Sequence, residues 1–323
     1  MEKFNNLIIT NLSGNENELL NIMELWNQDV GFIFPFYKEL LLQKIYNCPY
    51  FSKQGSFAVY DNNKIVGFIV SKIYDGNPIM SKYIDKGWVS LVYVSRKYRK
   101  QGIGRRLFEL SEVEMKKRGV TEIFFGTDYN NFFPGLPCDF FNASERFLEK
   151  MGYVLGHCSY DVIKNMKNYE IVPERETKYV IRYAKKADKD AVLKFFEKNF
   201  YGRWYFEAKE FFEEYYNETT YLIVLDEDTV VGFLRCNKET DKKISYNINW
   251  NKKFAQFEAY GPLGVDKDYR KLGLSRDLVV KALNDSKKNG ASDVLIDWTG
   301  LISLYQLFGF EVWKSYLHAT KKI

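Results

Sequence analysis

Apolar and polar residues follow two periods along this chain, one typical of strands and the other typical of helices. Three successive runs, 56–60, 64–73 and 87–94, are rich in β-branched and aromatic residues and are predicted to be strands. Residues 102–119 place apolar side chains at helical spacing, and Gly119 follows a basic last turn, so a long helix is predicted there. A strand, a short helix and terminal strands follow, which indicates an α/β order of elements.

The same pattern occurs twice along the chain. Four matches keep their order and similar intervals: "KIVGFIV" with "TVVGFLR" (64–70, 229–235), "VYVSRKYRKQGIGRRL" with "LGVDKDYRKLGLSRDL" (92–107, 263–278), "KKRGVTEIFF" with "KKNGASDVLI" (116–125, 287–296), and "FLEKMGY" with "LYQLFGF" (147–153, 304–310). Four ordered matches indicate a tandem duplication. We therefore predict two domains, residues 1–166 and 178–323, joined by a linker at residues 167–177.

Composition narrows the class of protein. The chain has 323 residues, 46% of them hydrophobic and 28% charged, which is typical of a soluble globular protein with about two domains. It contains no apolar run of about eighteen residues and no basic leader with an apolar stretch. We therefore expect a cytoplasmic protein that does not span a membrane.

The net charge and the few potential metal-binding side chains argue against further classes of protein. The net charge of +5 is mild, so we expect no nucleic-acid partner. The four cysteines lack C-x-x-C spacing, and the two histidines stand apart in the sequence. We therefore expect no metal site, no disulfide framework and no Ser/His/Asp relay.

The most informative stretch is "RKYRKQGIGRRL", residues 96–107. A strand that runs into a glycine-bearing turn and then a helix aims backbone N–H groups and the helix dipole at one point. Glycine lets a ligand approach those N–H groups closely. The pattern predicts a phosphate or pyrophosphate site, and the alternative is an ordinary helix start with a solvated basic face.

The two copies of this loop differ in charge. Residues 92–107 carry six basic side chains and no carboxylate, whereas the aligned residues 263–278 carry four basic side chains and three aspartates. Because a polyphosphate is repelled by carboxylates and held by Arg and Lys donors, the first copy is predicted to be the better cofactor site.

The segment Arg99–Gly104, "RKQGIG", resembles the [RQ]xxGx[GA] signature of the GNAT superfamily of acetyl-CoA-dependent N-acetyltransferases. Residues 270–275, "RKLGLS", are similar, with Ser275 where the family has Gly or Ala, and "LYQLFGF" resembles the family's "LYxKxGF". The resemblance implies two tandem GNAT domains, each a splayed mixed β-sheet flanked by helices. It implies acetyl-CoA as cofactor, with pantetheine between the splayed strands and pyrophosphate on the loop before the long helix.

Residue by residue, the resemblance places the cofactor on the first copy at Val92, Tyr93, Val94, Arg99, Lys100, Gln101, Gly102, Ile103, Gly104, Arg105 and Arg106. A second possible cofactor loop contains Val265, Arg270, Lys271, Gly273 and Ser275.

Candidate catalytic groups lie in the second copy. Tyr305 matches the family's tyrosine and could protonate a departing thiolate, whereas Leu148 stands there in the first copy. Glu258, on the predicted strand before the second loop, is a candidate base, while the first copy offers Ser90 on its strand. The alternatives are a tyrosine packed on an apolar helix face and an exposed strand carboxylate. The "YGPLG" run at 260–264 predicts a bulge or opened ladder.

Residues 129–142, "YNNFFPGLPCDFFN", form an aromatic insertion that is present only in the first copy. We expect it either to pack between the domains or to wall an acceptor pocket.

These observations predict an acyltransferase that moves an acetyl group from acetyl-CoA to a primary amine of a small molecule. Two rival functions remain open: a non-catalytic acyl-CoA sensor or interaction protein, and an aminoacyl transferase of the paired-GNAT type, against which the compact pyrophosphate loop argues. We expect a monomer or homodimer.

Overall fold

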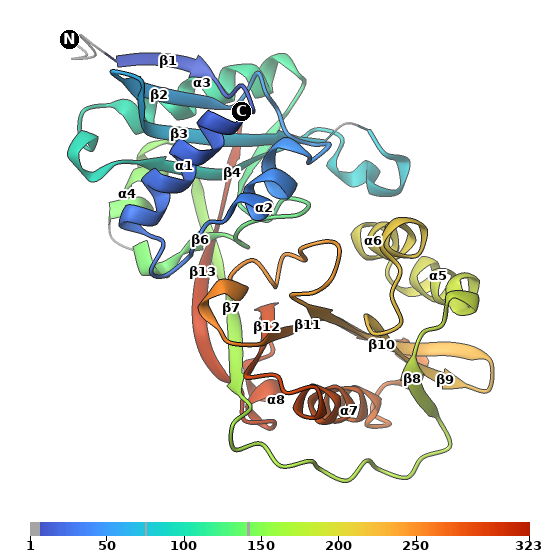
Figure 1. Cartoon of the computed structure of the whole chain (residues 1–323). Coiled ribbons are helices and arrows are strands. Elements are labelled where there is room, and N and C mark those ends of the chain that lie inside the picture. Colours follow the sequence, from blue (N-terminus) through green and yellow to red (C-terminus); the bar gives the residue numbers. More distant parts are fainter. Residues whose placement is uncertain (1–6, 75, 141–142) are drawn as a thin grey trace. The chain divides into compact units, whose positions relative to one another are not determined.

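The computed structural model describes residues 7–74, 76–140 and 143–323 (Figure 1). They form two compact units. Unit 1 comprises the described residues of 1–77, 82–159 and 314–323, and unit 2 comprises 78–81 and 160–313. The predicted domains, residues 1–166 and 178–323 with a linker at 167–177, stay a prediction.

Unit 1 is a mixed sheet with helices around it. Its strands lie in the order β1 (Leu7–Asn11), β2 (Phe57–Asp61), β3 (Lys64–Ile73), β4 (Lys86–Val94), β5 (Glu122–Phe125) and β13 (Glu311–Lys322), and β6 (Leu136–Pro137) pairs with β13. Its helices are α1 (Glu16–Asp29), α2 (Lys38–Leu41), the π-helix η1 (Leu42–Tyr46), α3 (Ile103–Lys117) and α4 (Ala143–Lys150), with short 3-10 turns η3 (Arg96–Tyr98) and η4 (Cys138–Phe140). The 3-10 turn η2 (Pro78–Tyr83) is divided between the two units, with residues 78–81 in unit 2.

Unit 2 repeats this plan. Its strands lie in the order β8 (Val180–Tyr183), β9 (Tyr221–Asp226), β10 (Thr229–Lys238), β11 (Phe257–Val265), β12 (Asp293–Thr299) and β7 (Val154–Asn165). Its helices are α5 (Lys189–Asn199), α6 (Arg203–Glu210), the π-helix η6 (Phe211–Tyr215), α7 (Leu274–Lys288) and α8 (Ile302–Gln306), with 3-10 turns η5 (Lys186–Asp188), η7 (Asn251–Lys253) and η8 (Lys267–Tyr269). Figure 1 shows α7 on one face of the sheet and α5 and α6 on the other.

In each unit the middle of the sheet contains a parallel pair that opens. Strands β4 and β5 pair in parallel only as far as Val89 and Phe125, and β11 and β12 only as far as Tyr260 and Ile296. The first strand of each pair continues beyond that point beside its antiparallel neighbour. The predicted splayed mixed sheet is therefore confirmed in both copies.

A β-bulge marks each opening. The register of β3 and β4 shifts between the pairs Val70–Leu91 and Ser71–Val89, which leaves Ser90 as the extra residue. The register of β10 and β11 shifts in the same place, at the Gly261–Pro262 step. The bulge predicted from "YGPLG" is confirmed. The matching bulge at Ser90 could not be predicted in this way, because that position has neither glycine nor proline.

The final strands are exchanged relative to the sequence repeat. In unit 1, residues 320–322 of β13, which belong to the second copy, pair with β5. In unit 2, residues 160–165 of β7, which belong to the first copy, pair with β12. Each unit is therefore completed by a strand from the other half of the sequence.

The described part of the aromatic insertion packs inside unit 1. Phe132 and Phe133 are buried, with ring centroids 5.5 Å from Phe36 and 4.9 Å from Phe34, respectively. Residues 141 and 142 of the insertion lie outside the described residues. The described part of the insertion thus contributes to the aromatic packing within unit 1.

Candidate functional site

The first basic loop has the backbone shape that the sequence predicts. Helix α3 begins after Gly102, which has φ 92°, and Lys100 also has a positive φ of 61°. Positive φ at Gly102 disfavours a larger residue, so the glycine leaves the first N–H groups of α3 uncovered. The side chains of Arg105 and Arg106, in the first turn, are exposed.

Local contacts hold the first loop in place. The Arg99 guanidinium donates from Nε to the carbonyl oxygen of Val94 at 2.8 Å and lies 5.4 Å from the centre of the Tyr93 ring. The Tyr98 hydroxyl donates to Asp61 at 2.6 Å. The loop is therefore fixed at its base while its other basic side chains remain accessible to a ligand.

Val92, Tyr93 and Val94 lie beyond the last β4–β5 pair, so β5 offers their backbone no partner. At the start of the opening, Ser90 donates to Asp128 at 2.7 Å, and the same buried carboxylate pairs with the buried Lys72 ammonium. The open edge of β4 matches the position that the family resemblance implies for pantetheine.

The second loop has the same backbone and a different chemistry. Lys271 and Gly273 have φ of 66° and 83°, as in the first loop. The residue aligned with Arg106 is Asp277, which is buried in the first turn of α7. The Arg175 guanidinium donates to both Asp277 oxygens, at 3.2 Å and 2.6 Å, and to the Leu272 carbonyl at 2.8 Å.

Arg175 also lies against the glycine of the second loop. A Cβ on Gly273 would stand 3.3 Å from the Arg175 Nη2 atom. The remaining second-loop residues Val265, Arg270 and Ser275 are placed as the alignment predicts, around the start of α7. Where the first loop presents a cation, the second presents a carboxylate that is already paired.

The opening in unit 2 contains Asp297, a residue that the sequence analysis did not single out. Asp297 follows the last β11–β12 pair and is half-buried. Burial, followed by the charge of Asp161, raises the pKa of Asp297 to about 8. A Cβ on Gly261, at the bulge, would lie 3.1 Å from its Oδ1 atom. A carboxyl with this pKa can exchange a proton near neutral pH.

Aromatic rings and a cation surround this opening. The Arg203 guanidinium lies 4.8 Å from the centre of the Tyr246 ring and 5.5 Å from that of Trp298. Its charge favours the ionised form of Asp297 and opposes the effect of burial. The repeat alignment contained a signal for this site, because it sets Asp297 opposite Gly126.

The predicted Tyr305 lies on α8 and is buried. Its ring centroid lies 6.0 Å from that of Phe310, and burial followed by the Asp297 charge raises its pKa to about 12. The Asp297 charge thus links the two groups electrostatically. Leu148, aligned with Tyr305, is buried in the unit 1 core.

The predicted Glu258 lies within the paired part of β11, before the opening. Its carboxylate accepts a hydrogen bond from Ser286 of α7, and Lys238 Nζ lies 3.8 Å from it. The described contacts of Glu258 and Tyr305 do not join these two side chains. The carboxylate is directed to the α7 side of the sheet.

The sequence profile of the acetyltransferase (GNAT) family matches residues 19–133 and 189–310, most of the chain. The chain belongs to this family. Over 137 residues it is 26% identical to N-alpha-acetyltransferase 30 of Schizosaccharomyces pombe, a match that covers 42% of the chain and 77% of that protein. Acetyl transfer is therefore supported as the general reaction, with acetyl-CoA or another acyl-CoA as the family's cofactor.

Solved structures show the same tandem GNAT fold. A glucosamine N-acetyltransferase region of a fungal multi-domain β-N-acetylglucosaminidase superposes with a TM-score of 0.85 at 20% identity, covering 97% of this chain and 38% of the longer one. A tandem GNAT protein from the clavulanic acid biosynthesis pathway superposes with a TM-score of 0.71 at 14% identity, covering 98% of both chains.

The described residues of this GNAT protein include neither a membrane-spanning helix nor a cluster of metal-binding side chains. No helix in that part of the chain is long and apolar enough to cross a membrane. The same residues contain no group of three or more His, Cys, Asp or Glu side chains arranged to hold a metal ion.

Proposed function

We propose that this protein transfers an acetyl group from acetyl-CoA to a primary amine of a small molecule, with the cofactor held by Arg99–Arg106. The contrast between Arg106 and Asp277 carries this proposal. At the same point of two equivalent helices, the first copy has an exposed cation and the second a buried carboxylate held by Arg175. A polyanion is attracted to the exposed cation of the first loop, and it gains little binding energy at the paired carboxylate of the second loop.

The residues of the first loop fit the cofactor. Gly102 leaves the first N–H groups of α3 uncovered, and exposed Arg105 and Arg106 offer charge-assisted hydrogen bonds. Beyond Val89 the open edge of β4 supplies backbone groups to an amide-containing arm. When bound, acetyl-CoA supplies the acyl group as a thioester.

A second arrangement is favoured by the groups at the unit 2 opening. Asp297, with a pKa near 8, is suited to accept a proton from a substrate ammonium, and Tyr305 holds a proton at its hydroxyl for a departing thiolate. In this arrangement the cofactor would lie on Arg270–Ser275, and Arg175 would become a phosphate donor. Asp297 takes precedence over Glu258 as the proposed base, because Glu258 is engaged by Ser286 and Lys238.

The fungal region with the highest of these TM-scores is named for glucosamine, so an amino sugar is the first acceptor to test. The panel should add an amino acid, a polyamine and an N-terminal peptide, each incubated with acetyl-CoA and followed by mass spectrometry. Acetylation of a small amine supports the proposal. Coenzyme binding without acetylation of any amine would favour a non-catalytic acyl-CoA sensor. Transfer only from an aminoacyl donor would favour an aminoacyl transferase.

The cofactor site is tested by calorimetric titration of acetyl-CoA into two matched variants of the full chain. Arg105→Glu/Arg106→Glu reverses two exposed charges on the first loop, and Arg270→Glu/Arg276→Glu does the same on the second. Two reversed phosphate contacts should raise the dissociation constant about a hundredfold or more in the first variant only. Weakening only in the second variant would move the cofactor to unit 2.

A further inference from the structure

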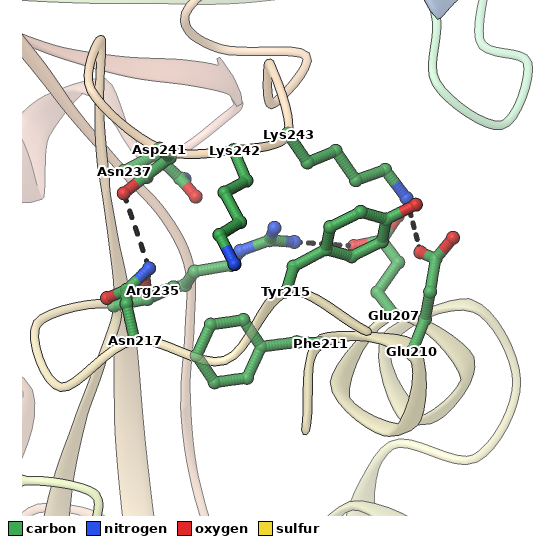
Figure 2. A pocket seen from close by; sticks show the side chains of 11 residues that line it. Glu207, Glu210, Phe211, Tyr215, Asn217, Arg235, Asn237, Asp241, Lys242 and Lys243 are labelled. Atoms are coloured by element: carbon green, nitrogen blue, oxygen red, sulfur yellow. Dashed lines mark hydrogen bonds and ion pairs between the residues drawn. The ribbon is translucent and has the colours of Figure 1, made fainter. Parts of the chain in front are cut away.

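Unit 2 contains a pocket on the face of its sheet that α6 and η6 cover (Figure 2). Its enclosed space is about 10 Å³, room for about one water molecule, and the rest of the hollow is open to solvent. Glu207 and Glu210 of α6, Arg235 and Asn237 of β10, and Lys242 in the turn after β10 contribute to its lining. The pocket is separate from both basic loops in sequence.

Arg235 has an unmet hydrogen-bonding requirement in this pocket. Its side chain is only 10% exposed, and its Nη1 atom lies 3.3 Å from the Glu207 carboxylate. Its Nε atom has no hydrogen-bond partner in the part of the chain that the structure describes. Leaving a buried N–H donor unsatisfied costs about 1–3 kcal/mol, so this group points to a ligand.

The carboxylates of the pocket already have partners within the protein. Glu207 accepts hydrogen bonds from Arg203 and Arg235, and Glu210 pairs with Lys243. Asp241 accepts from the backbone N–H of Lys238 at 2.8 Å and from the Asn217 amide at 3.4 Å.

Lys242 brings a second cation to the same pocket. It is exposed, and within the described residues it forms no ion pair. Figure 2 shows its side chain extending over the pocket. Glu207 and Glu210 are each paired with a cation, whereas Asp241 accepts only from neutral donors. The cationic donors that these contacts leave for a ligand are Nε of Arg235 and the ammonium of Lys242.

We propose that this pocket binds the oxyanion of a small polar molecule, a carboxylate or a phosphate, between Arg235 and Lys242. Guanidinium and ammonium groups form their strongest hydrogen bonds with such oxygens. The neighbouring Thr220 and Asn217 provide neutral polar surface. A ligand without an oxyanion would offer no charged acceptor to the Arg235 Nε–H and the Lys242 ammonium.

Asn237 connects the pocket with the opening of the sheet. It lines the pocket, and its amide lies 3.1 Å from Asn247 Oδ1 and 3.4 Å from the carbonyl oxygen of Gly261 at the bulge. The opening also contains Asp297. We therefore assign the oxyanion to the acceptor molecule, which would carry both the amine and the oxyanion. This assignment, unlike oxyanion binding, rests on the second arrangement of the proposed function, in which the reaction takes place at the unit 2 opening.

The test is calorimetric titration of the full chain, without coenzyme, using L-glutamate, glucosamine 6-phosphate and glucosamine as probes. L-glutamate tests whether the pocket binds a carboxylate, and glucosamine 6-phosphate tests whether it binds a phosphate. Glucosamine has neither group and is the control ligand. We expect saturable binding of at least one oxyanion probe, weakened about three- to tenfold in Lys242→Gln and more in Lys242→Glu. Lys194→Gln, an exposed lysine on α5 outside the pocket, is the matched control and should leave binding unchanged.

A second variant keeps the test informative if pocket packing changes. Arg235→Lys retains the charge and removes the Nε–H donor, so it should weaken the oxyanion probe about tenfold while retaining the thermal transition. Equal binding of glucosamine and glucosamine 6-phosphate, or no binding of any probe, overturns the proposal. Binding that is lost in Arg105→Glu/Arg106→Glu but kept in Lys242→Glu also overturns it.

The two proposals fail in different experiments. A chain that binds the oxyanion through Lys242 but acetylates no amine contradicts the proposed function alone. A chain that acetylates amines at equal rates with and without an oxyanion, and shows no Lys242 effect, contradicts the pocket alone.

Discussion

Arg175 and Asp277, 102 residues apart in sequence, form a bidentate ion pair at the start of α7, with nitrogen–oxygen distances of 3.2 Å and 2.6 Å. The guanidinium comes from the segment that joins the two sequence repeats. It neutralises a carboxylate at the point where the first copy has Arg106. Arg175, a single residue of the linker, thus makes the second loop chemically different from the first, although the two loops have the same backbone conformation.

Arg175→Ala should lower the stability of the folded chain, because it leaves the buried Asp277 carboxylate without its partner. If acetyl-CoA binds the first loop, its dissociation constant should change less than about twofold. Denaturant unfolding and calorimetry of the full chain measure both quantities. Arg276→Ala, an exposed neighbour, is the control, and a tenfold loss of coenzyme affinity in Arg175→Ala alone would make Arg175 a phosphate ligand.

Tyr305→Phe should lower kcat about a hundredfold if the hydroxyl supplies a proton, while the ring still packs on Phe310. Stability should change by less than about 1 kcal/mol, as for most substitutions that preserve packing. Steady-state kinetics with acetyl-CoA and the best amine provide the measurement. Tyr153→Phe is the matched control, since that tyrosine is also buried and its hydroxyl has no partner in the described residues. Equal kcat in both variants would leave Tyr305 a packing residue.

If the cofactor lies on the unit 2 loop, Asp297→Asn should lower kcat/KM about a hundredfold and remove a rise in rate centred near pH 8, because only the ionised carboxyl accepts a proton. Asp161→Asn should instead move this rise to lower pH, since the Asp161 charge helps to raise the pKa of Asp297. A pH–rate profile for each variant distinguishes these effects. An unchanged profile in both would exclude Asp297 as the base.

The same carboxyl makes stability depend on pH. A folded-state pKa raised to about 8 stabilises the folded chain at pH values below the ordinary aspartate pKa, and this contribution is lost as the pH rises through about 8. In Asp297→Asn that decline should be smaller, which chemical denaturation at pH 5 and pH 8.5 would show.

His318→Gln should make the chain less sensitive to acid. The His157 and His318 rings stack with centroids 4.2 Å apart, and burial followed by the His157 charge lowers the pKa of His318 to about 4. Because the unfolded chain takes up this proton at higher pH, stability should fall as the pH drops from about 6.5 towards 4. Glutamine can keep a hydrogen bond to Ser159, now 3.0 Å from Nε2. Urea unfolding at pH 7 and pH 4.5 should show a smaller loss in the variant than in the natural chain, and equal losses would contradict this assignment.

The local features of the fold could be predicted because each depends on a short stretch of sequence. The glycine-bearing loops, the long helices and the bulge at Gly261 follow from residue type and spacing. The roles of Arg175 and Asp297 could not be predicted in this way. The Arg175 contact spans 102 residues, and the Asp297 pKa depends on burial and on Asp161 from another strand.

The exchange of β7 and β13 has a consequence for synthesis of the chain on the ribosome. Strand β5 pairs with β4 on one side, and it acquires its second partner only after residues 320–322 have been made, when all of unit 2 has already been translated. Until then the other side of β5 is an open sheet edge, the kind of surface on which strands of other chains can add. Such a distant pairing is also slow to form, since its loop must close over many residues. We therefore expect the nascent protein to depend on a chaperone during this interval.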